Sequence, residues 1–97
     1  MPKGYWIALY RKVTNPDALA EYAKLAKPAI EAGGGRFLIR GVPTKAYEGG
    51  INERTVVIEF DSVQLAIKTY ESDAYKVARR KLDGAVERDV RIVEGAS

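Results

Sequence analysis

The order of strand-like and helix-like segments is the feature that most constrains this fold. Runs rich in β-branched and aromatic residues, typical of strands, cover residues 5–13, 36–41, 54–61 and 89–94. Apolar residues at three- and four-residue spacing, typical of amphipathic helices, cover residues 16–32 and 63–82, with a second helix start at Ser72. The order βαββαβ predicts a ferredoxin-like α+β fold, a four-stranded antiparallel sheet with helices on one face. A chain of 97 residues fits one domain, so residues 1–97 are predicted to form a single unit.

The connection between the predicted second and third strands, residues 42–53, is unusually long and contains Pro43, Gly49 and Gly50. Hairpin loops commonly have about two to five residues, so we expect an extended arm here. Segments of this kind often contact partners or ligands, and Glu48 is a candidate for reaching into a partner's cleft.

Alternation along the strands predicts which face of the sheet meets the helices. The more apolar set is expected under the helices, and it comprises Val56, Ile58, Phe60, Phe37 and Ile39. The opposite face would then carry Trp6, Ala8, Tyr10, Leu38, Val57 and Val93. Large exposed apolar patches are rare on monomers, so the sequence predicts a homodimer in which this face is covered by a second copy. The alternative is a monomer whose aromatic sheet face is partly wet.

The chain contains neither cysteine nor histidine. Disulfides, thiolate chemistry and thiolate or imidazole metal ligands are therefore excluded, and we predict no metal site and no cofactor. Acid–base chemistry would have to use Asp, Glu, Tyr, Lys or Arg, or be supplied by a reactive substrate.

The formal net charge of +3 is too small a bias to indicate a nucleic-acid binder. An RNA-recognition domain shares the βαββαβ order, but it needs aromatics on its central strands, and residues 55–59 offer none. No segment has the apolar length of a signal peptide or a membrane span. The sequence thus favours a cytoplasmic protein with no membrane or nucleic-acid partner.

Short motifs spread over nearly the whole chain resemble the family called domain of unknown function 1330, in the dimeric α+β barrel group. The matching pieces are Gly4-Tyr5-Trp6, Tyr22, Pro28, Gly34-Gly35-Arg36, Arg40-Gly41, Glu48-Gly49, Val57-Ile58-Glu59-Phe60, Ala66, Tyr70, Ser72-Asp73-Ala74-Tyr75, Arg80 and Ile92-Val93-Glu94-Gly95. The stretch from Lys81 to Asp89 departs from the pattern. The resemblance implies a dimeric barrel and no established activity. Relatives by fold include cofactor-free monooxygenases and small isomerases, an analogy of fold alone.

Arg40 and Glu59 form the first candidate constellation. Alternation places both on the face pointing away from the helices, on neighbouring strands, with Trp6 and Tyr10 beside them. Such a pair can hold a small anion or shift a carboxylate pKa, so Arg40 is the candidate anion holder and Glu59 the candidate general base. The alternative is an ion pair that only fixes the dimer.

A second constellation lies on the predicted last helix. Tyr75 and Arg79 share one helical face and could reach over a pocket mouth to hold a carboxylate or phosphate, while Tyr22 could line the same cavity. The alternatives are core packing for both tyrosines and a solvated face for Arg79. Two functions remain open at this stage: a protein that binds or transforms a small organic acid, and a non-catalytic interaction module.

Overall fold

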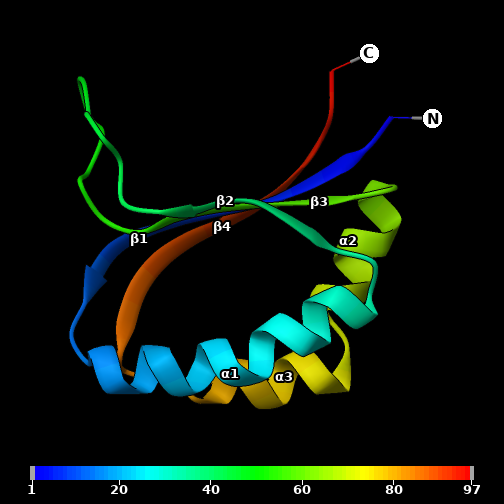
Figure 1. The fold of residues 1–97 in the computed structure, drawn as a ribbon, viewed down its shortest axis with the longest axis horizontal. Coiled ribbons are helices and arrows are strands. Elements are labelled where there is room, and N and C mark those ends of the chain that lie inside the picture. Colours follow the sequence, from blue (N-terminus) through cyan, green and yellow to red (C-terminus); the bar gives the residue numbers. More distant parts are fainter. Residues whose placement is uncertain (1, 97) are drawn as a thin grey trace.

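The computed structural model describes residues 2–96, so Met1 and Ser97 of the predicted unit lie outside it. Its elements, in chain order, are β1 (Gly4–Val13), α1 (Pro16–Ala32), β2 (Arg36–Gly41), β3 (Thr55–Phe60), α2 (Val63–Tyr70), α3 (Asp73–Arg80) and β4 (Val86–Glu94) (Figure 1). The predicted element order is confirmed, with the second helical region divided into α2 and α3 at Ser72.

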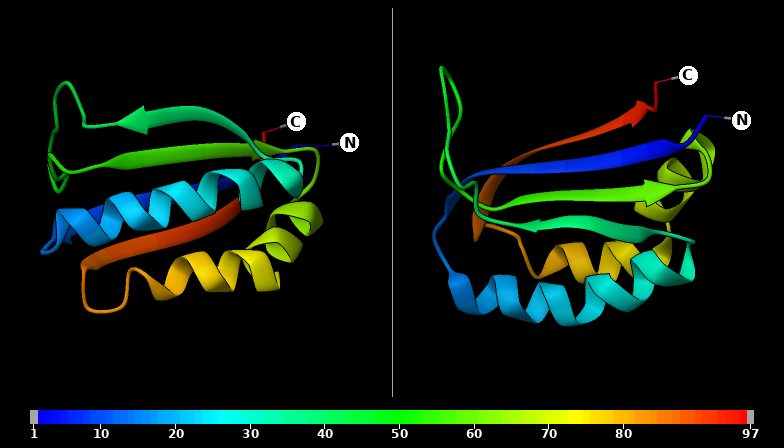
Figure 2. Two further views of the ribbon diagram at one scale, coloured as in Figure 1. Left: turned by 60° about the horizontal axis from the view of Figure 1, so that its bottom comes forward. Right: turned by 45° about the horizontal axis from the view of Figure 1, so that its top comes forward.

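The four strands form one antiparallel sheet in the order β2-β3-β1-β4. The three helices lie on one face, with α1 and α3 side by side (Figures 1 and 2). The predicted ferredoxin-like topology is therefore confirmed, and no helix of residues 2–96 covers the other face of the sheet. Across residues 2–96, no helix is long and apolar enough to cross a membrane.

Side-chain caps fix where each helix begins. The side chain of Asn15 accepts a hydrogen bond from the Ala18 amide at 3.1 Å, directly before Pro16 in the first helical position. The hydroxyls of Ser62 and Ser72 accept in the same way at the starts of α2 and α3. Helix α1 ends at Gly33, and Gly34 follows with φ of +94°, a value that glycine adopts without strain.

The predicted facing of β1 is wrong. Trp6, Ala8 and Tyr10 are only 1%, 2% and 3% exposed, and they lie on the helix side of the sheet. In the register, Trp6 faces Ile58 and Ala8 faces Val56, so β1 presents the same face as β3 to the core. The outer face instead carries Tyr5, Ile7 and Leu9. Both faces of β1 are apolar, which is why hydrophobicity could not distinguish them.

A bulge in β2 overturns a second expectation. Phe37 pairs with Ile58, but Ile39 pairs with Val57, so the register shifts by one residue between Phe37 and Ile39. The extra residue reverses the alternation from that point. Ile39 therefore lies on the outer face, 52% exposed, and Arg40 turns to the helix side opposite Val56.

The outer face remains apolar, with a different membership from the one predicted. Its exposed apolar side chains include Leu9 and Ile39, with Val93 on β4 and Leu38 at the bulge. The connection over residues 42–53 stands up from the sheet on the side opposite the helices (Figure 1). The predicted extended arm is thus present, and it carries the exposed Tyr47.

Candidate functional site

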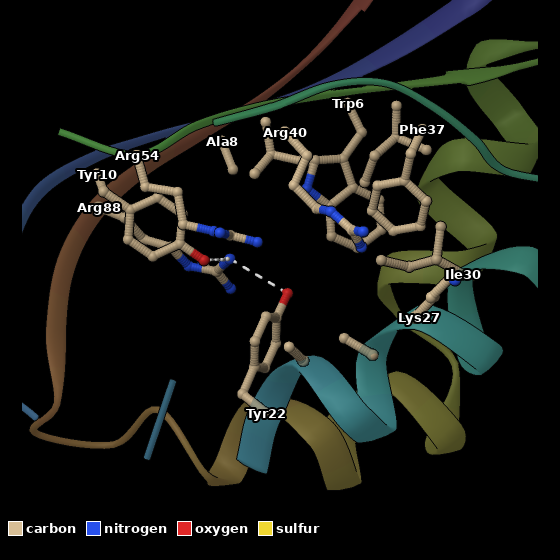
Figure 3. A pocket seen from close by; sticks show the side chains of 14 residues that line it. Trp6, Ala8, Tyr10, Tyr22, Lys27, Ile30, Phe37, Arg40, Arg54 and Arg88 are labelled. Carbon is tan, nitrogen blue, oxygen red and sulfur yellow. Dashed lines mark hydrogen bonds between the residues drawn. The ribbon is translucent and has the colours of Figure 1, made fainter. Parts of the chain in front are cut away.

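A pocket lies between the middle of the sheet and helix α1 (Figure 3). Trp6, Ala8 and Tyr10 form part of its sheet side, and the small Ala8 leaves a space between two large rings. Tyr22 projects into it from α1 (Figure 3), and Ala26, one turn further along the helix, also lines it. The cavity volume is about 30 Å³, room for one or two water molecules.

The register of the strands arranges side chains on the pocket side of the sheet into three rows that run across the strands, here called rungs. Across the sheet they are Phe37–Ile58–Trp6–Ile92, then Arg40–Val56–Ala8–Val90, then Arg54–Tyr10–Arg88. The first rung is entirely apolar and aromatic, and the third carries two guanidinium groups. The pocket therefore has a cationic end at Arg54 and Arg88. Across the small side chain of Ala8 lies an aromatic end, where the Arg40 guanidinium sits over the Phe37 ring, 5.2 Å from its centroid.

Tyr10 is the centre of the cationic end. Its amide donates to the Arg54 carbonyl at 3.0 Å, and it pairs with Arg88 on β4. Both guanidinium carbons lie over its ring, at 6.0 Å from the centroid for Arg54 and 5.7 Å for Arg88. Each distance is within the range of a cation–π interaction, so one ring holds two positive charges at the same end of the pocket.

Arg88 connects this rung to the helices through three tyrosine hydroxyls. Its Nη2 donates to the Tyr75 hydroxyl at 2.8 Å, and its Nη1 lies 3.4 Å from the hydroxyls of Tyr10 and Tyr22. The hydroxyls of Tyr22 and Tyr75 are themselves 2.8 Å apart. The network joins α1, α3, β1 and β4 around one guanidinium.

The pocket is positively charged and lacks compensating carboxylates. Four of its lining residues are cationic, namely Lys27, Arg40, Arg54 and Arg88, and none is Asp or Glu. Among the ion pairs of residues 2–96, none involves any of these four. The Nε atom of Arg54 is buried and has no hydrogen-bond partner among residues 2–96.

The protonation states of Tyr10, Tyr75 and Arg88 are fixed at neutral pH. Burial raises the pKa of Tyr10 and, together with the neighbouring Tyr22, raises that of Tyr75. Burial alone would lower the pKa of Arg88, but its interactions with Tyr75, Tyr22 and Tyr10 outweigh burial and raise it. Tyr10 and Tyr75 therefore stay neutral and Arg88 stays charged at neutral pH.

The structure separates the residues that the sequence grouped. Trp6, Tyr10, Tyr22 and Arg40 line the pocket, and Tyr75 reaches it through the hydroxyl of Tyr22. Arg79 does not line the pocket and instead lies over the Tyr70 ring at 5.6 Å.

The expected pair of Arg40 and Glu59 is not formed, because the bulge in β2 turns Arg40 to the helix side. Glu59 stays on the outer face, where it accepts hydrogen bonds from the Tyr5 hydroxyl at 3.0 Å and from Arg36 Nε at 3.1 Å. These bonds lower the pKa of Glu59, which makes it a weaker base than an ordinary glutamate. Glu59 therefore lies on the wrong face of the sheet, and is too weak a base, to act as the predicted general base of this pocket.

Sequence reasoning missed Lys27, Arg54 and Arg88. A signal was present for the two arginines. Side chains two residues apart lie on the same face of a strand. Arg54 is therefore in line with Val56 and Ile58, and Arg88 is in line with Val90 and Ile92. The fourth strand was expected to begin at Asp89, one residue too late to include Arg88. Among residues 2–96, no group of three or more His, Cys, Asp or Glu side chains is placed to hold a metal ion.

Comparison with known families gives one match along almost the whole chain. A family model described as a domain of unknown function, DUF1330, matches residues 3–96. No curated protein sequence matches.

Solved structures share the fold at low sequence identity. A protein of unknown function from Rhodopseudomonas palustris is 17% identical with a TM-score of 0.73, covering 99% of this chain and 84% of that one. A dimeric ferredoxin-like protein of unknown function from Thermobifida fusca is 15% identical with a TM-score of 0.67, covering 96% and 91%. A protein from Bacillus halodurans described as an ethyl tert-butyl ether d (EthD) family protein is 17% identical with a TM-score of 0.67, covering 99% of this chain and 100% of that one.

Proposed function

Because this chain belongs to the DUF1330 family, whose description assigns no activity, the function must be argued from the site, and we propose that the pocket binds a small organic anion. The sequence predicts such a ligand in a pocket between the sheet and the helices. We propose that the ligand binds there, between Trp6 and the rung of Arg54, Tyr10 and Arg88.

The observation that carries this proposal is the unpartnered Nε of Arg54 in a pocket without carboxylates. A buried donor without a partner is costly, and a buried charge without a counter-charge costs more. Proteins normally pair such groups, so an anion from outside the chain would complete the hydrogen bonding of Arg54. A bound carboxylate would supply both acceptor oxygens and negative charge.

The shape of the pocket limits the ligand. The cationic end fits one carboxylate. At the opposite end Trp6, Phe37 and Ile58 would contact a short apolar group once the Arg40 guanidinium leaves the Phe37 ring. The cavity volume of about 30 Å³ admits only very small molecules unless the exposed side chains of Lys27 and Arg40 move aside. We infer a monocarboxylate with a small aliphatic or aromatic group as the ligand class.

The lining residues favour binding over acid–base catalysis. General bases at neutral pH are usually carboxylates or imidazoles, and the pocket lining contains neither. If the bound molecule reacts, its own chemistry must supply the base. The pocket would then contribute fixed positive charge around a developing anion.

We also propose that the protein works as a homodimer joined through the outer face of the sheet. The exposed side chains of Leu9, Ile39 and Val93 support this, because a soluble protein rarely leaves such a patch uncovered. The Thermobifida fusca protein of the same fold is described as dimeric. In this arrangement Glu59, held by Tyr5 and Arg36, fixes the geometry of the contact face and has no role in the ligand pocket.

The binding proposal is tested by calorimetric titration with acetate, propionate and benzoate in chloride-free buffer of low ionic strength. We expect saturable binding that weakens about tenfold or more in Arg54→Met, since hydrogen bonds to charged groups are worth about 1.5–3 kcal/mol. Arg80→Met, which removes an exposed arginine of α3, is the matched control and should bind normally. The proposal fails if no carboxylate saturates the wild-type protein, or if the two variants bind alike.

A further inference from the structure

The number of hydroxyl protons in the network of Arg88, Tyr75 and Tyr22 determines which tyrosine donates to the other. Arginine only donates hydrogen bonds, whereas each tyrosine hydroxyl donates one and accepts two. Tyr75 is fully buried, and its hydroxyl contacts the Tyr22 hydroxyl and Arg88 Nη2, each at 2.8 Å. Because Arg88 must donate to Tyr75, the Tyr75 proton has one acceptor within this network, the oxygen of Tyr22.

The direction of the bond between the two tyrosines follows from this count. If Tyr22 donated to Tyr75, the Tyr75 proton would be buried without an acceptor, which is costly. Donation from Tyr75 to Tyr22 satisfies both residues. The Tyr22 oxygen then accepts from Tyr75 and, at 3.4 Å, from Arg88, so both of its lone pairs are used. The proton of the Tyr22 hydroxyl therefore points neither at Tyr75 nor at Arg88.

The remaining direction is the pocket. Tyr22 lines the cavity whereas Tyr75 does not. Figure 3 shows the Tyr22 hydroxyl rising from α1 into the space below Arg54, Arg88 and Arg40. Two donors behind a hydroxyl polarise it and strengthen the bond that it donates in turn. The chain from Arg88 through Tyr75 to Tyr22 thus ends in one O–H group aimed at the ligand position.

We propose that Tyr22 determines the ligand class of the pocket by donating a hydrogen bond to an oxygen anion, with Tyr75 as the positioning residue that orients the Tyr22 proton. This inference rests on the proposed anion binding. The guanidinium groups alone would accept any anion of suitable size. The additional O–H donor favours a carboxylate or enolate oxygen over a halide, since a halide is a weaker hydrogen-bond acceptor.

The test compares two probe anions, acetate and bromide, by amide chemical-shift titration of the wild type and of Tyr22→Phe. We expect Tyr22→Phe to weaken acetate binding about tenfold while bromide affinity stays within twofold, so that the ratio of the two affinities falls. A purely structural defect would weaken both anions together. Tyr47→Phe, on the exposed arm, removes a hydroxyl of a residue that does not line the pocket and is the matched control.

A second variant covers the loss of folding that an isolated Tyr75 hydroxyl could cause. Tyr22→Phe combined with Tyr75→Phe removes both hydroxyls, so no tyrosine proton is left without an acceptor and only Arg88 Nη2 loses its partner. This double variant should show the same fall in the acetate-to-bromide ratio. If the ratio is unchanged in both variants, the role of Tyr22 is refuted although anion binding stands. If neither anion binds the wild type, the proposed function itself fails.

Discussion

Tyr10 and Arg88 face each other across β1 and β4, and the Arg88 guanidinium lies over the Tyr10 ring 5.7 Å from its centroid. This pair closes the cationic end of the pocket on rigid strands and does not depend on a loop. The guanidinium is half-buried against neutral tyrosines, with no carboxylate among the pocket-lining residues. Its position is therefore well defined by hydroxyl acceptors, whereas the pocket lining supplies no counter-ion.

The same guanidinium makes one substitution lower both stability and binding. Arg88→Met keeps much of the side-chain volume but removes the donor to the hydroxyls of Tyr75, Tyr22 and Tyr10. We expect the free energy of unfolding, measured in urea, to fall by about 1–3 kcal/mol in a protein that still folds. Benzoate affinity should fall about tenfold or more. Unchanged benzoate affinity in folded Arg88→Met would place the anion away from this guanidinium.

The small side chain of Ala8 provides a second test, because it makes the space between Trp6 and Tyr10. Ala8→Val adds two carbon atoms to a cavity of about 30 Å³ and should abolish ligand binding by filling it. Overpacking costs about 1–3 kcal/mol, so we expect a folded but less stable protein with an unchanged far-ultraviolet circular dichroism spectrum. Ile7→Val changes the neighbouring residue on the outer face and should leave binding intact. Normal affinity in Ala8→Val would place the ligand elsewhere.

The topology could be predicted from the sequence because each element has a clear local signal. Asn15-Pro16, Ser62 and Ser72 mark helix starts through their own hydrogen bonds, and these survive in the structure. The alternation in β3 separates Val56 and Ile58 from Glu59 without ambiguity. Such signals need no knowledge of which elements pack together.

The site could be predicted only in part, because the facing of a strand is a tertiary property. β1 is apolar on both sides, so nothing local shows that Trp6 and Tyr10 belong under the helices. The bulge in β2 reverses Arg40 and has no mark in the sequence comparable to a helix cap. Trp6, Tyr10, Tyr22 and Arg40 were all candidates from the sequence, and all four line the pocket. The predicted pairing of Arg40 with Glu59 was wrong.

The polar cluster around Glu59 predicts how stability depends on pH. Hydrogen bonds from Tyr5 and Arg36 lower the pKa of Glu59 below its ordinary value of 4.5. A group with a lowered folded-state pKa contributes stability that is fully present above its unfolded pKa. That contribution is lost as pH falls through the lower, folded-state pKa.

We therefore expect the urea midpoint of the wild type to fall as the solution is acidified from about pH 6 to pH 3. Glu59→Gln should make this fall shallower, because glutamine does not titrate. Tyr5→Phe removes the largest cause of the shift and should reduce the slope by a smaller amount. Equal slopes in the wild type and Glu59→Gln would mean that the remaining carboxylates account for the whole acid response.

The exposed valines of β4 and α3 test the proposed dimer. Val93 lies on the outer face of the sheet and is 46% exposed, whereas Val77 lies on α3 and is 48% exposed. An aspartate buried at an interface without a partner is strongly unfavourable, so Val93→Asp should convert the dimer to a monomer. Val77→Asp introduces the same charge at a matched exposure and should leave the assembly unchanged. Multi-angle light scattering over a range of concentrations distinguishes the masses of monomer and dimer. A wild-type protein that stays monomeric at the highest concentration would contradict the proposal that a second copy covers this face.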